Sequence, residues 1–219
     1  MSSVKIELSL CNHYKNKPYK VLDRAIHSET QEELILYKTM YKNNLSSLWV
    51  RPKENFNEVI QVNGKPVRRF TPATVRLETK DYVKGSDIDA ICKFSERIFK
   101  GIDKNELSLR LQNAPMALLI TAFRGEQIIG YKLGYQKSNE TFYSWLGAVD
   151  KDYRGYGLGQ SLIEHQHSWC KMKGYSTVET KTLNQWTAML HLNLKMGFLI
   201  VSTKSCEKHG IKIVMRKEL

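Results

Sequence analysis

The stretch of residues 145–162 constrains the fold most, because it joins an apolar run to a glycine-rich turn and a helix-like segment. The run ends at Val149, and the turn contains Arg154-Gly155-Tyr156-Gly157-Leu158-Gly159, after which apolar residues recur at helical spacing. A turn between a strand and a helix leaves several backbone N–H groups unpaired, and the helix dipole adds partial positive charge. Gly157 and Gly159 have no Cβ, so a ligand can approach the main chain closely. The stretch therefore predicts a pocket for a phosphate or pyrophosphate group.

Two familiar phosphate-binding motifs do not fit this turn. The dinucleotide fingerprint G-x-G-x-x-G requires a spacing that Gly155, Gly157 and Gly159 do not provide. The P-loop requires G-K-[ST], whereas Gly159 is followed by glutamine and serine. The pattern that fits is R-x-x-G-x-G, which begins at Arg154 and has a valine five residues before the arginine.

This pattern resembles the acetyl-CoA pyrophosphate loop of the GNAT superfamily of N-acetyltransferases. A second match lies downstream and is similar to the last conserved helix of that superfamily, which typically closes with K-x-G-F. The two matches stand in the expected order along the chain. The residues that carry the second match are Asn184, Met189, Leu192, Asn193, Lys195, Gly197 and Phe198.

Alternating elements are expected from residue 75 to residue 219. Apolar spacing and turn residues give the order β-α-α-β-β-β-α-β-α-β-β, which is the topology of the superfamily. Ser86-Asp87 and Asp103 are suited to cap the first two helices. The resemblance implies an α+β (mixed α/β) fold, in which helices flank a mixed, mostly antiparallel central sheet. Helices are expected at 86–99, 103–113, 158–173 and 186–196, and strands at 75–79, 117–123, 128–135, 141–149, 177–183, 198–203 and 211–215.

The resemblance also implies acetyl-CoA as co-substrate, with no metal. The diphosphate would bind the backbone N–H groups of residues 154–159, and the Arg154 side chain would add positive charge near phosphate. The pantetheine arm would pair like an extra strand with main-chain groups of Gly147, Ala148 and Val149.

The second match implies further contacts to the co-substrate, and it departs from the family at two positions. Asn184 and Lys195 are candidates to bind the co-substrate, although Trp186 occupies the position where asparagine is more common. Many members have a tyrosine four residues before the G-F pair, where it can protonate the CoA thiolate. Asn193 stands there, and an amide can donate a hydrogen bond to sulfur but cannot release a proton at neutral pH. The proton then comes from water, from the substrate or from another acid, and Asn193 either contacts the sulfur or packs locally.

The remaining site candidates lie on the strands beside the co-substrate. Glu179 is expected next to the co-substrate strand, where burial would raise the pKa of its carboxyl group and suit it to accept a proton. A solvent-facing glutamate is the alternative. Tyr143 and Trp145 either shape the acceptor pocket or fill the core of the sheet.

The first part of the chain has a different character. Short β-favouring runs, one of them at residues 56–62, are separated by turn signals, of which Asn63-Gly64 is the strongest. They predict a small, mostly β domain. A domain boundary is expected near Thr71-Pro72, which gives domains 1–72 and 73–219. Residues 11–70 resemble a small bacterial domain that has no established activity. The residues that carry this resemblance are His13-Tyr14-Lys15, Tyr19, His27-Ser28-Glu29-Thr30, Tyr37, Trp49-Val50-Arg51-Pro52, Phe56 and Arg69-Phe70.

Composition limits which binding partners and which cellular compartment we expect for this protein. The net charge of +12 is spread over both parts of the chain, which favours an anionic ligand such as CoA. Nucleic acid is not favoured, because no K/R-rich run is present. No apolar run approaches a membrane span, and the four cysteines form no C-x-x-C pair. We therefore expect a cytoplasmic protein without a metal or membrane partner, as a monomer or homodimer.

Three hypotheses follow. The leading one is an N-acetyltransferase that moves an acetyl group from acetyl-CoA to a primary amine of a small molecule or peptide. The second, which Asn193 motivates, is a non-catalytic acyl-CoA sensor whose N-terminal domain binds a partner. The third is a modifier that uses its basic surface and N-terminal aromatic residues to reach a nucleic acid.

Overall fold

A computed structural model describes residues 2–98, 103–206 and 210–219 of the chain. The described residues divide into two compact units, of which the larger contains Arg76–Leu219 and the smaller contains Lys5–Val75. The predicted boundary at residues 72/73 falls inside strand β7 (Phe70–Lys80), and the division into domains at that point stays a prediction.

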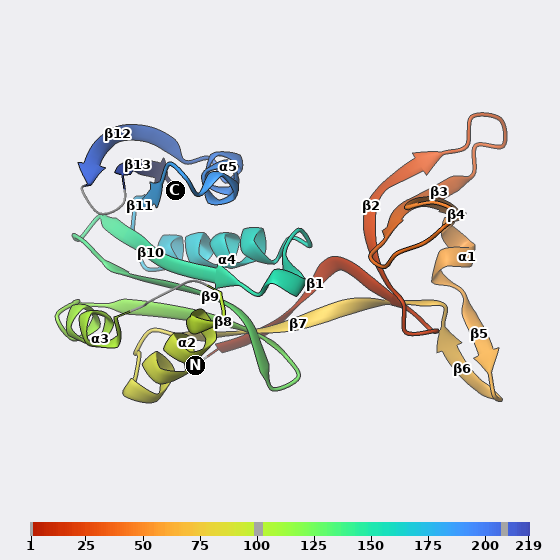
Figure 1. The fold of residues 1–219 in the computed structure, drawn as a ribbon, viewed down its shortest axis with the longest axis horizontal. Helices are drawn as coiled ribbons and strands as arrows, with labels where there is room; N and C mark the ends of the chain where they lie inside the picture. The colour runs from red at the N-terminus through yellow and green to blue at the C-terminus, as the bar shows by residue number, and fades with distance from the viewer. Residues whose placement is uncertain (1, 99–102, 207–209) are drawn as a thin grey trace. The chain divides into compact units, whose positions relative to one another are not determined.

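The larger unit is built on one twisted, mixed sheet (Figure 1). Its strand order is β12-β13-β11-β10-β9-β8-β7, and the β10–β11 pair is parallel while the other neighbours run antiparallel. The prediction of a mixed, mostly antiparallel sheet is confirmed. Besides β7, the strands are β8 (Ala117–Arg124), β9 (Gln127–Gln136), β10 (Thr141–Val149), β11 (Thr177–Leu183), β12 (Leu199–Cys206) and β13 (Gly210–Glu218).

Helices lie on both faces of this sheet, and a 3-10 turn, η1 (Lys151–Tyr153), precedes the glycine turn. Alternation along β9 fixes the two faces, because Tyr131 and Leu133 share a core with α2 and α3, whereas a Cβ at Gly130 would meet leucines of α4. The α4 face also carries Phe142, whose ring lies 5.4 Å from that of Trp169. The helices are α2 (Gly85–Glu96), α3 (Lys104–Gln112), α4 (Leu158–Met172) and α5 (Thr187–Lys195).

The two predicted helix caps had different outcomes. Asp103 caps α3 as predicted, since its Oδ1 accepts the N–H groups of Asn105 at 2.8 Å and Glu106 at 3.1 Å. The helix that was expected to begin at residue 86 begins one residue earlier. There the Asp87 carboxylate accepts the backbone N–H of Lys84 at 3.0 Å and so acts from inside the first turn. The predicted end at residue 99 lies outside the described residues.

The smaller unit is mostly β, as predicted. Its strands follow the order β7-β1-β2-β3-β4, and β5 and β6 form a separate hairpin. That hairpin turns at Asn63 and Gly64, whose φ angles of 51° and 76° are typical of the tight turn that an Asn-Gly pair favours. The elements are β1 (Ser2–His13), β2 (Pro18–Ile26), β3 (Glu33–Thr39), β4 (Leu48–Pro52), α1 (Lys53–Asn57), β5 (Val59–Val62) and β6 (Lys65–Arg68).

Aromatic side chains form the core of the smaller unit. The rings of Phe56 and Phe70 stack at 4.1 Å, and Tyr37 packs against both. The prediction that placed Phe56 in a strand was wrong, because it lies in the short helix α1, from which it reaches this core. Partly buried Tyr19 and Trp49 pack against the same cluster.

None of the described helices of either unit is long and apolar enough to cross a membrane.

Candidate active site

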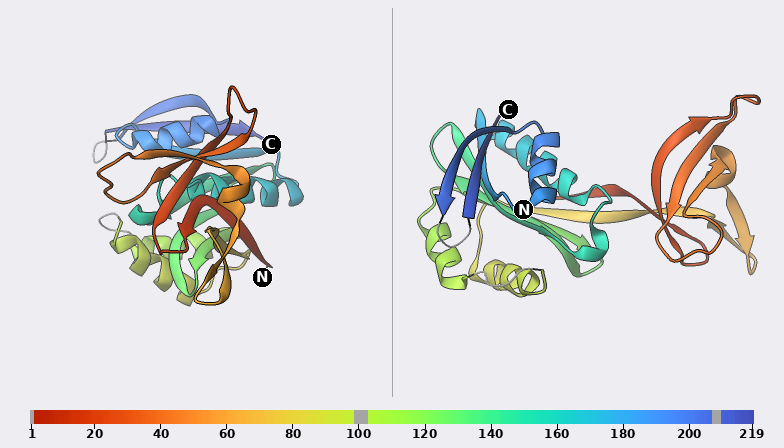
Figure 2. Two further views of the ribbon diagram at one scale, coloured as in Figure 1. Left: turned by 90° about the vertical axis from the view of Figure 1, so that its right-hand side faces the viewer. Right: turned by 45° about the horizontal axis from the view of Figure 1, so that its top comes forward.

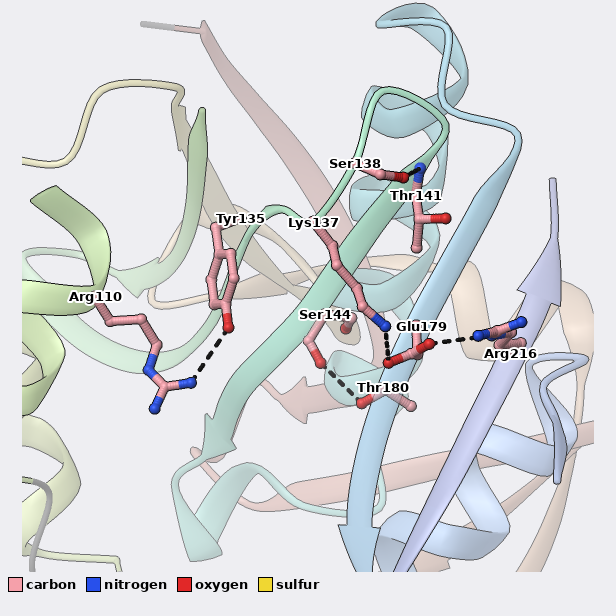
Figure 3. A network of polar contacts seen from close by, with 9 residues as sticks. All are labelled: Arg110, Tyr135, Lys137, Ser138, Thr141, Ser144, Glu179, Thr180 and Arg216. Atoms are coloured by element: carbon pink, nitrogen blue, oxygen red, sulfur yellow. Dashed lines mark hydrogen bonds and ion pairs between the residues drawn. The ribbon is translucent and has the colours of Figure 1, made fainter. Parts of the chain in front are cut away.

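The centre of the larger unit is a gap between two parallel strands. Pairing of β10 with β11 runs from Thr141 opposite Thr177 to Ser144 opposite Thr180 and then ends. The Thr180 hydroxyl donates to the Ser144 carbonyl at 2.8 Å and closes the paired segment (Figure 3). Beyond this point β10 stays paired with β9, and β11 stays paired with β13. Within the described residues, the edge of β10 after Ser144 is therefore left without a strand partner on the β11 side.

A β-bulge decides which side chains of β10 face which helices. The register of β9 against β10 shifts between Ser144 and Leu146. As a result, Trp145 and Leu146 both pack against the core beneath α2 and α3. Gly147 then faces the side of α4 and α5, where a Cβ on it would lie 3.1 Å from the Cδ of Lys132.

The glycine turn between β10 and α4 has the geometry of an anion cradle. Gly155 and Gly157 have φ angles of 80° and 87°, and Gly157 is the N-cap of α4 without any side-chain cap. The N–H groups of residues 155–160 donate no hydrogen bond to any residue within the described ranges. A Cβ at Gly155 or Gly157 would meet nothing within 4 Å, so the main chain is open at these two positions. A diphosphate fits this arrangement of free donors and positive helix dipole.

Gly159 also has a packing role. A Cβ at this position would lie 3.1 Å from the Leu192 Cδ2 of α5, so the absence of a side chain allows α4 and α5 to pack closely. The right-hand view of Figure 2 shows these two helices next to each other. We expect Gly159→Ala to weaken this packing and to lower the free energy of unfolding by about 1 kcal/mol, as measured by urea denaturation.

Arg154 ties the turn to the end of β10. Its Nε donates to the Val149 carbonyl at 3.0 Å, which uses one acceptor of the predicted pantetheine edge. The terminal nitrogens of its guanidinium group are left to approach an anion. The side chains of Tyr156 and Leu158 are buried, so these two residues offer only their main chain to a ligand.

The residues of the second sequence match lie around α5. Asn184 precedes the helix and Lys195 ends it, and both side chains are exposed. Asn193 is 3% exposed and faces the interior, and its carbonyl accepts the Phe198 N–H at 3.0 Å. The roles of all three toward a co-substrate stay predictions.

Glu179 is buried between two cations (Figure 3). Its side chain is 2% exposed, and its carboxylate accepts from Lys137 Nζ at 2.6 Å and Arg216 Nε at 3.0 Å. Burial alone would raise the pKa of Glu179, but the hydrogen bonds and charges of Lys137 and Arg216 outweigh burial and lower it. The expectation of a raised pKa was therefore wrong, and this carboxylate is a poor proton acceptor.

We expect Glu179→Gln to cost about 1–2 kcal/mol of the free energy of unfolding at neutral pH, because Lys137 and Arg216 are half-exposed and recover part of their solvation. A carboxyl group whose pKa is lowered on folding adds stability above its ordinary pKa of 4.5, and that stability is lost as the pH falls. The difference between the two proteins in urea denaturation should therefore shrink below about pH 4.5. Glu106→Gln, at an exposed pair with Arg110, is the control. An undiminished difference in acid would contradict the ion-pair explanation.

Aromatic rings line the α2–α3 face beside Glu179. The Tyr135 ring lies 5.3 Å from the Tyr143 ring and 5.5 Å from the Trp145 ring. Arg110 of α3 stacks over Trp145 at 4.8 Å, and Lys181 lies 5.5 Å from the centre of the Tyr143 ring. Next to these rings is an open groove of about 500 Å³, lined by Glu106, Leu109, Arg110, Asn113, Ala114, Pro115, Tyr135, Gln136 and Lys137.

Sequence reasoning found Tyr143 and Trp145 but missed Tyr135, Arg110 and Lys137. Tyr135 reaches Tyr143 because the antiparallel register places them opposite each other, and no spacing along the chain reveals this pair. Of the residues that the structure describes, no three histidine, cysteine, aspartate or glutamate side chains are grouped as a metal site.

The comparisons with known families agree with this geometry. The model of the acetyltransferase (GNAT) domain matches residues 81–219, which is more than half of the chain. The chain therefore belongs to the GNAT acetyltransferase family. A second model, described as a protein of unknown function (DUF1653), matches residues 10–72. No curated protein matches the chain.

Several solved structures share the fold of the larger unit. Ard1 from Thermoplasma volcanium is 15% identical with a TM-score of 0.57, over 65% of this chain and 97% of that one. The ribosomal-protein-S18-alanine N-acetyltransferase from Escherichia coli is 16% identical with a TM-score of 0.56, over 65% and 93%. A GNAT family acetyltransferase from Elizabethkingia anophelis, solved with acetyl-CoA bound, is 20% identical with a TM-score of 0.51, over 65% and 98%.

Proposed function

We propose that this protein transfers an acetyl group from acetyl-CoA to a primary amine, by direct attack of the amine on the thioester. The observation that carries the proposal is the unpaired edge of β10, which leads directly into the uncapped start of α4. An extended pantetheine arm needs such an edge, and a diphosphate needs such a helix start. The membership of residues 81–219 in the acetyltransferase family supports the same assignment.

In this proposal each part of the co-substrate has its own partner. The N–H groups of residues 155–160 hold the diphosphate, and the guanidinium group of Arg154 adds positive charge. Main-chain groups of Gly147 and Ala148 hold the pantetheine arm. Val149 contributes less than the sequence suggests, because its carbonyl is already bonded to Arg154. Asn184 and Lys195, which are both exposed, would contact the outer part of the co-substrate from the side of α5.

The acceptor amine would approach from the opposite face of the sheet, past Tyr143 and Trp145. Cations predominate there, because Glu179 is paired with both Lys137 and Arg216 and Lys181 lies over the Tyr143 ring, while Arg110 over Trp145 is paired with Glu106. An acceptor that carries a carboxylate near its amine, whether a small molecule or a peptide, fits this surface better than a polyamine.

A thiol-release assay with acetyl-CoA tests the proposal against a panel of amines. The panel contains amino acids, short peptides with acidic or neutral N-terminal residues, and polyamines. We expect turnover with at least one primary amine and the highest kcat/KM for acceptors that carry a carboxylate. CoA binding in calorimetry without turnover on any acceptor would contradict catalysis, and the absence of CoA binding would contradict the whole proposal.

A non-catalytic acyl-CoA sensor is the second candidate. Two observations favour it: Asn193 has no proton to give at neutral pH, and the lowered pKa of Glu179 makes it a poor base. The sensor would bind acetyl-CoA as tightly as the enzyme and would use residues 10–72 to bind a partner. Partner capture that changes when CoA is added, in a protein that shows no turnover, would support this alternative. A nucleic-acid substrate stays the least favoured prediction, and location in the cytoplasm and a monomeric or dimeric state stay predictions as well.

A further inference from the structure

Lys132, in the middle of β9, is a buried lysine without a partner. Its side chain is 7% exposed. It makes no salt bridge and no side-chain hydrogen bond with any residue in the described part of the chain. Burial lowers the pKa of its amino group from 10.5 to about 8. Such a lysine is costly for the fold, which raises the question of what its ammonium group does.

The register of the sheet places Lys132 next to β10, the strand that would bind the co-substrate. Lys132 of β9 lies directly opposite Gly147 of β10. The Cδ and Nζ of Lys132 lie 3.1 Å and 3.6 Å from the point where a Cβ on Gly147 would stand. Because Gly147 has no side chain, the lysine side chain can lie against the main chain of β10 at this position. The amino group thus reaches the strand that would hold the thioester arm.

The surroundings of Lys132 are cationic or neutral. His167 of α4 is buried, its Nε2 has no partner among the described residues, and its pKa is lowered to about 4 by burial and by the charges of Lys217, Lys132 and Lys171. Lys217 of β13 donates to the Met196 carbonyl at 2.7 Å and lies 3.4 Å from His167. No described carboxylate neutralises this pocket. The ammonium group of Lys132 is therefore left to stabilise an anion that develops at the edge of β10, whereas Lys217 is held by the Met196 carbonyl.

We propose that Lys132 is the catalytic acid that protonates the departing thiolate of CoA. Asn193 cannot perform this step, because its amide group does not release a proton at neutral pH. The proposal rests on the proposed acetyl transfer. The amine nitrogen forms a bond to the thioester carbon, the C–S bond breaks, and sulfur leaves with the electron pair. Sulfur takes one proton from the Lys132 ammonium group, the acceptor nitrogen releases one proton to water, and solvent returns one proton to Lys132. Charge and protons therefore balance over one turnover.

A purely structural role explains Lys132 less well. A structural lysine in a β-sheet normally pairs with a carboxylate or a carbonyl, as Lys217 and Lys137 do here. Lys132 has neither among the residues that the structure describes, and the glycine opposite it leaves room for the lysine side chain against β10.

Three variants test the role of Lys132 in the full chain. Lys132→Met removes the proton and keeps an unbranched side chain, and Lys132→Arg keeps the charge but does not release a proton near neutral pH. Lys217→Met removes a neighbouring, half-buried cation that is not among the atoms nearest to Gly147, and it serves as the matched control. Each protein is titrated with CoA by calorimetry, and the thiolate of the bound CoA is followed against pH by its ultraviolet absorbance. Turnover is then measured with acetyl-CoA and the best acceptor over the same range of pH.

We expect Lys132→Met to bind CoA about as tightly as the wild type, but to turn over roughly 100-fold or more slowly, which is the usual range for loss of a general acid. The wild-type rate should fall above about pH 8 as Lys132 loses its proton, and the variant should lack this alkaline limb. In Lys132→Met the thiol pKa of bound CoA should rise. Lys132→Arg should keep that pKa low while its turnover stays slow, and Lys217→Met should resemble the wild type in its pH profile.

The outcomes separate this proposal from the proposed function. If Lys132→Met keeps the wild-type rate, pH profile and bound-thiol pKa, the role of Lys132 is refuted while acetyl transfer stands. If the wild type binds CoA but shows no turnover, an unchanged thiol pKa in Lys132→Met still overturns the proposal, and a raised one supports it. If the wild type does not bind CoA at all, both proposals fail.

Discussion

Gly157→Ala is expected to lower the affinity for CoA by about 10- to 100-fold. This is the effect of losing one charge-assisted hydrogen bond from the main chain to the diphosphate. Gly157 has a φ of 87° and begins α4, and a Cβ on it would project into the open space in front of the free N–H groups. The methyl group would hold the diphosphate away from its donors. It would also strain the backbone, because a residue with a side chain rarely adopts such an angle.

A matched glycine separates these two effects. Gly174, at the end of α4, has a φ of 85°, and a Cβ on it would also meet nothing within 4 Å. Gly174→Ala should therefore lose about the same 1–2 kcal/mol of unfolding free energy as Gly157→Ala. Calorimetric titration of both variants with CoA gives the comparison. Equal affinities in the two variants would contradict a diphosphate site at the start of α4.

Lys132→Met is expected to raise the free energy of unfolding by about 3 kcal/mol at neutral pH. This value is the lowering of the Lys132 pKa on folding multiplied by about 1.36 kcal/mol for each pKa unit. The pKa of Lys132 falls from 10.5 in the unfolded chain to about 8 in the fold because the amino group is buried. The fold therefore bears the full cost of the buried charge below about pH 8 and progressively less as the pH rises toward 10.5. The advantage of the methionine variant should fade over the same range.

Urea denaturation of both proteins at neutral pH and near pH 10.5 measures this difference. Lys217→Met is the control, and it should lose about 1 kcal/mol, because Lys217 has a hydrogen bond to lose. A variant that is both more stable and slower shows that Lys132 is retained for function. A loss of stability in Lys132→Met would show that the lysine has a structural partner after all.

The sequence revealed the elements of the larger unit well. Strands at 141–149 and 177–183 have the predicted bounds, because each apolar run is enclosed by strong turn residues. The start of α2 was one residue off, since a lysine supplies no side-chain cap to recognise and Asp87 acts from within the turn. Phe56 was misplaced because its aromatic ring favours a strand, whereas the core of the smaller unit is reached from a single turn of helix.

The candidate site was predictable only where it consists of main chain. The glycine turn and the strand end at 147–149 follow from local residue order, and the described residues leave the N–H groups of 155–160 without partners. The ion pairs of Glu179 and the position of Lys132 depend on which residues stand opposite each other in the sheet. The pairing of Lys132 with Gly147 follows the β-bulge near Ser144, which leaves no mark in the sequence, and Arg216 stands opposite Glu179 in the β11–β13 pair.

Amide chemical shifts of the full chain, followed by NMR during titration with CoA, test the central claim most directly. We expect the largest changes at the N–H groups of residues 155–160, with further changes at Gly147 and Ala148, because the former would hold the diphosphate and the latter the pantetheine arm. Gly174 and the Asn63-Gly64 turn should not respond. Saturable binding whose shifts fall elsewhere on the larger unit, or no binding at millimolar CoA, would contradict the account.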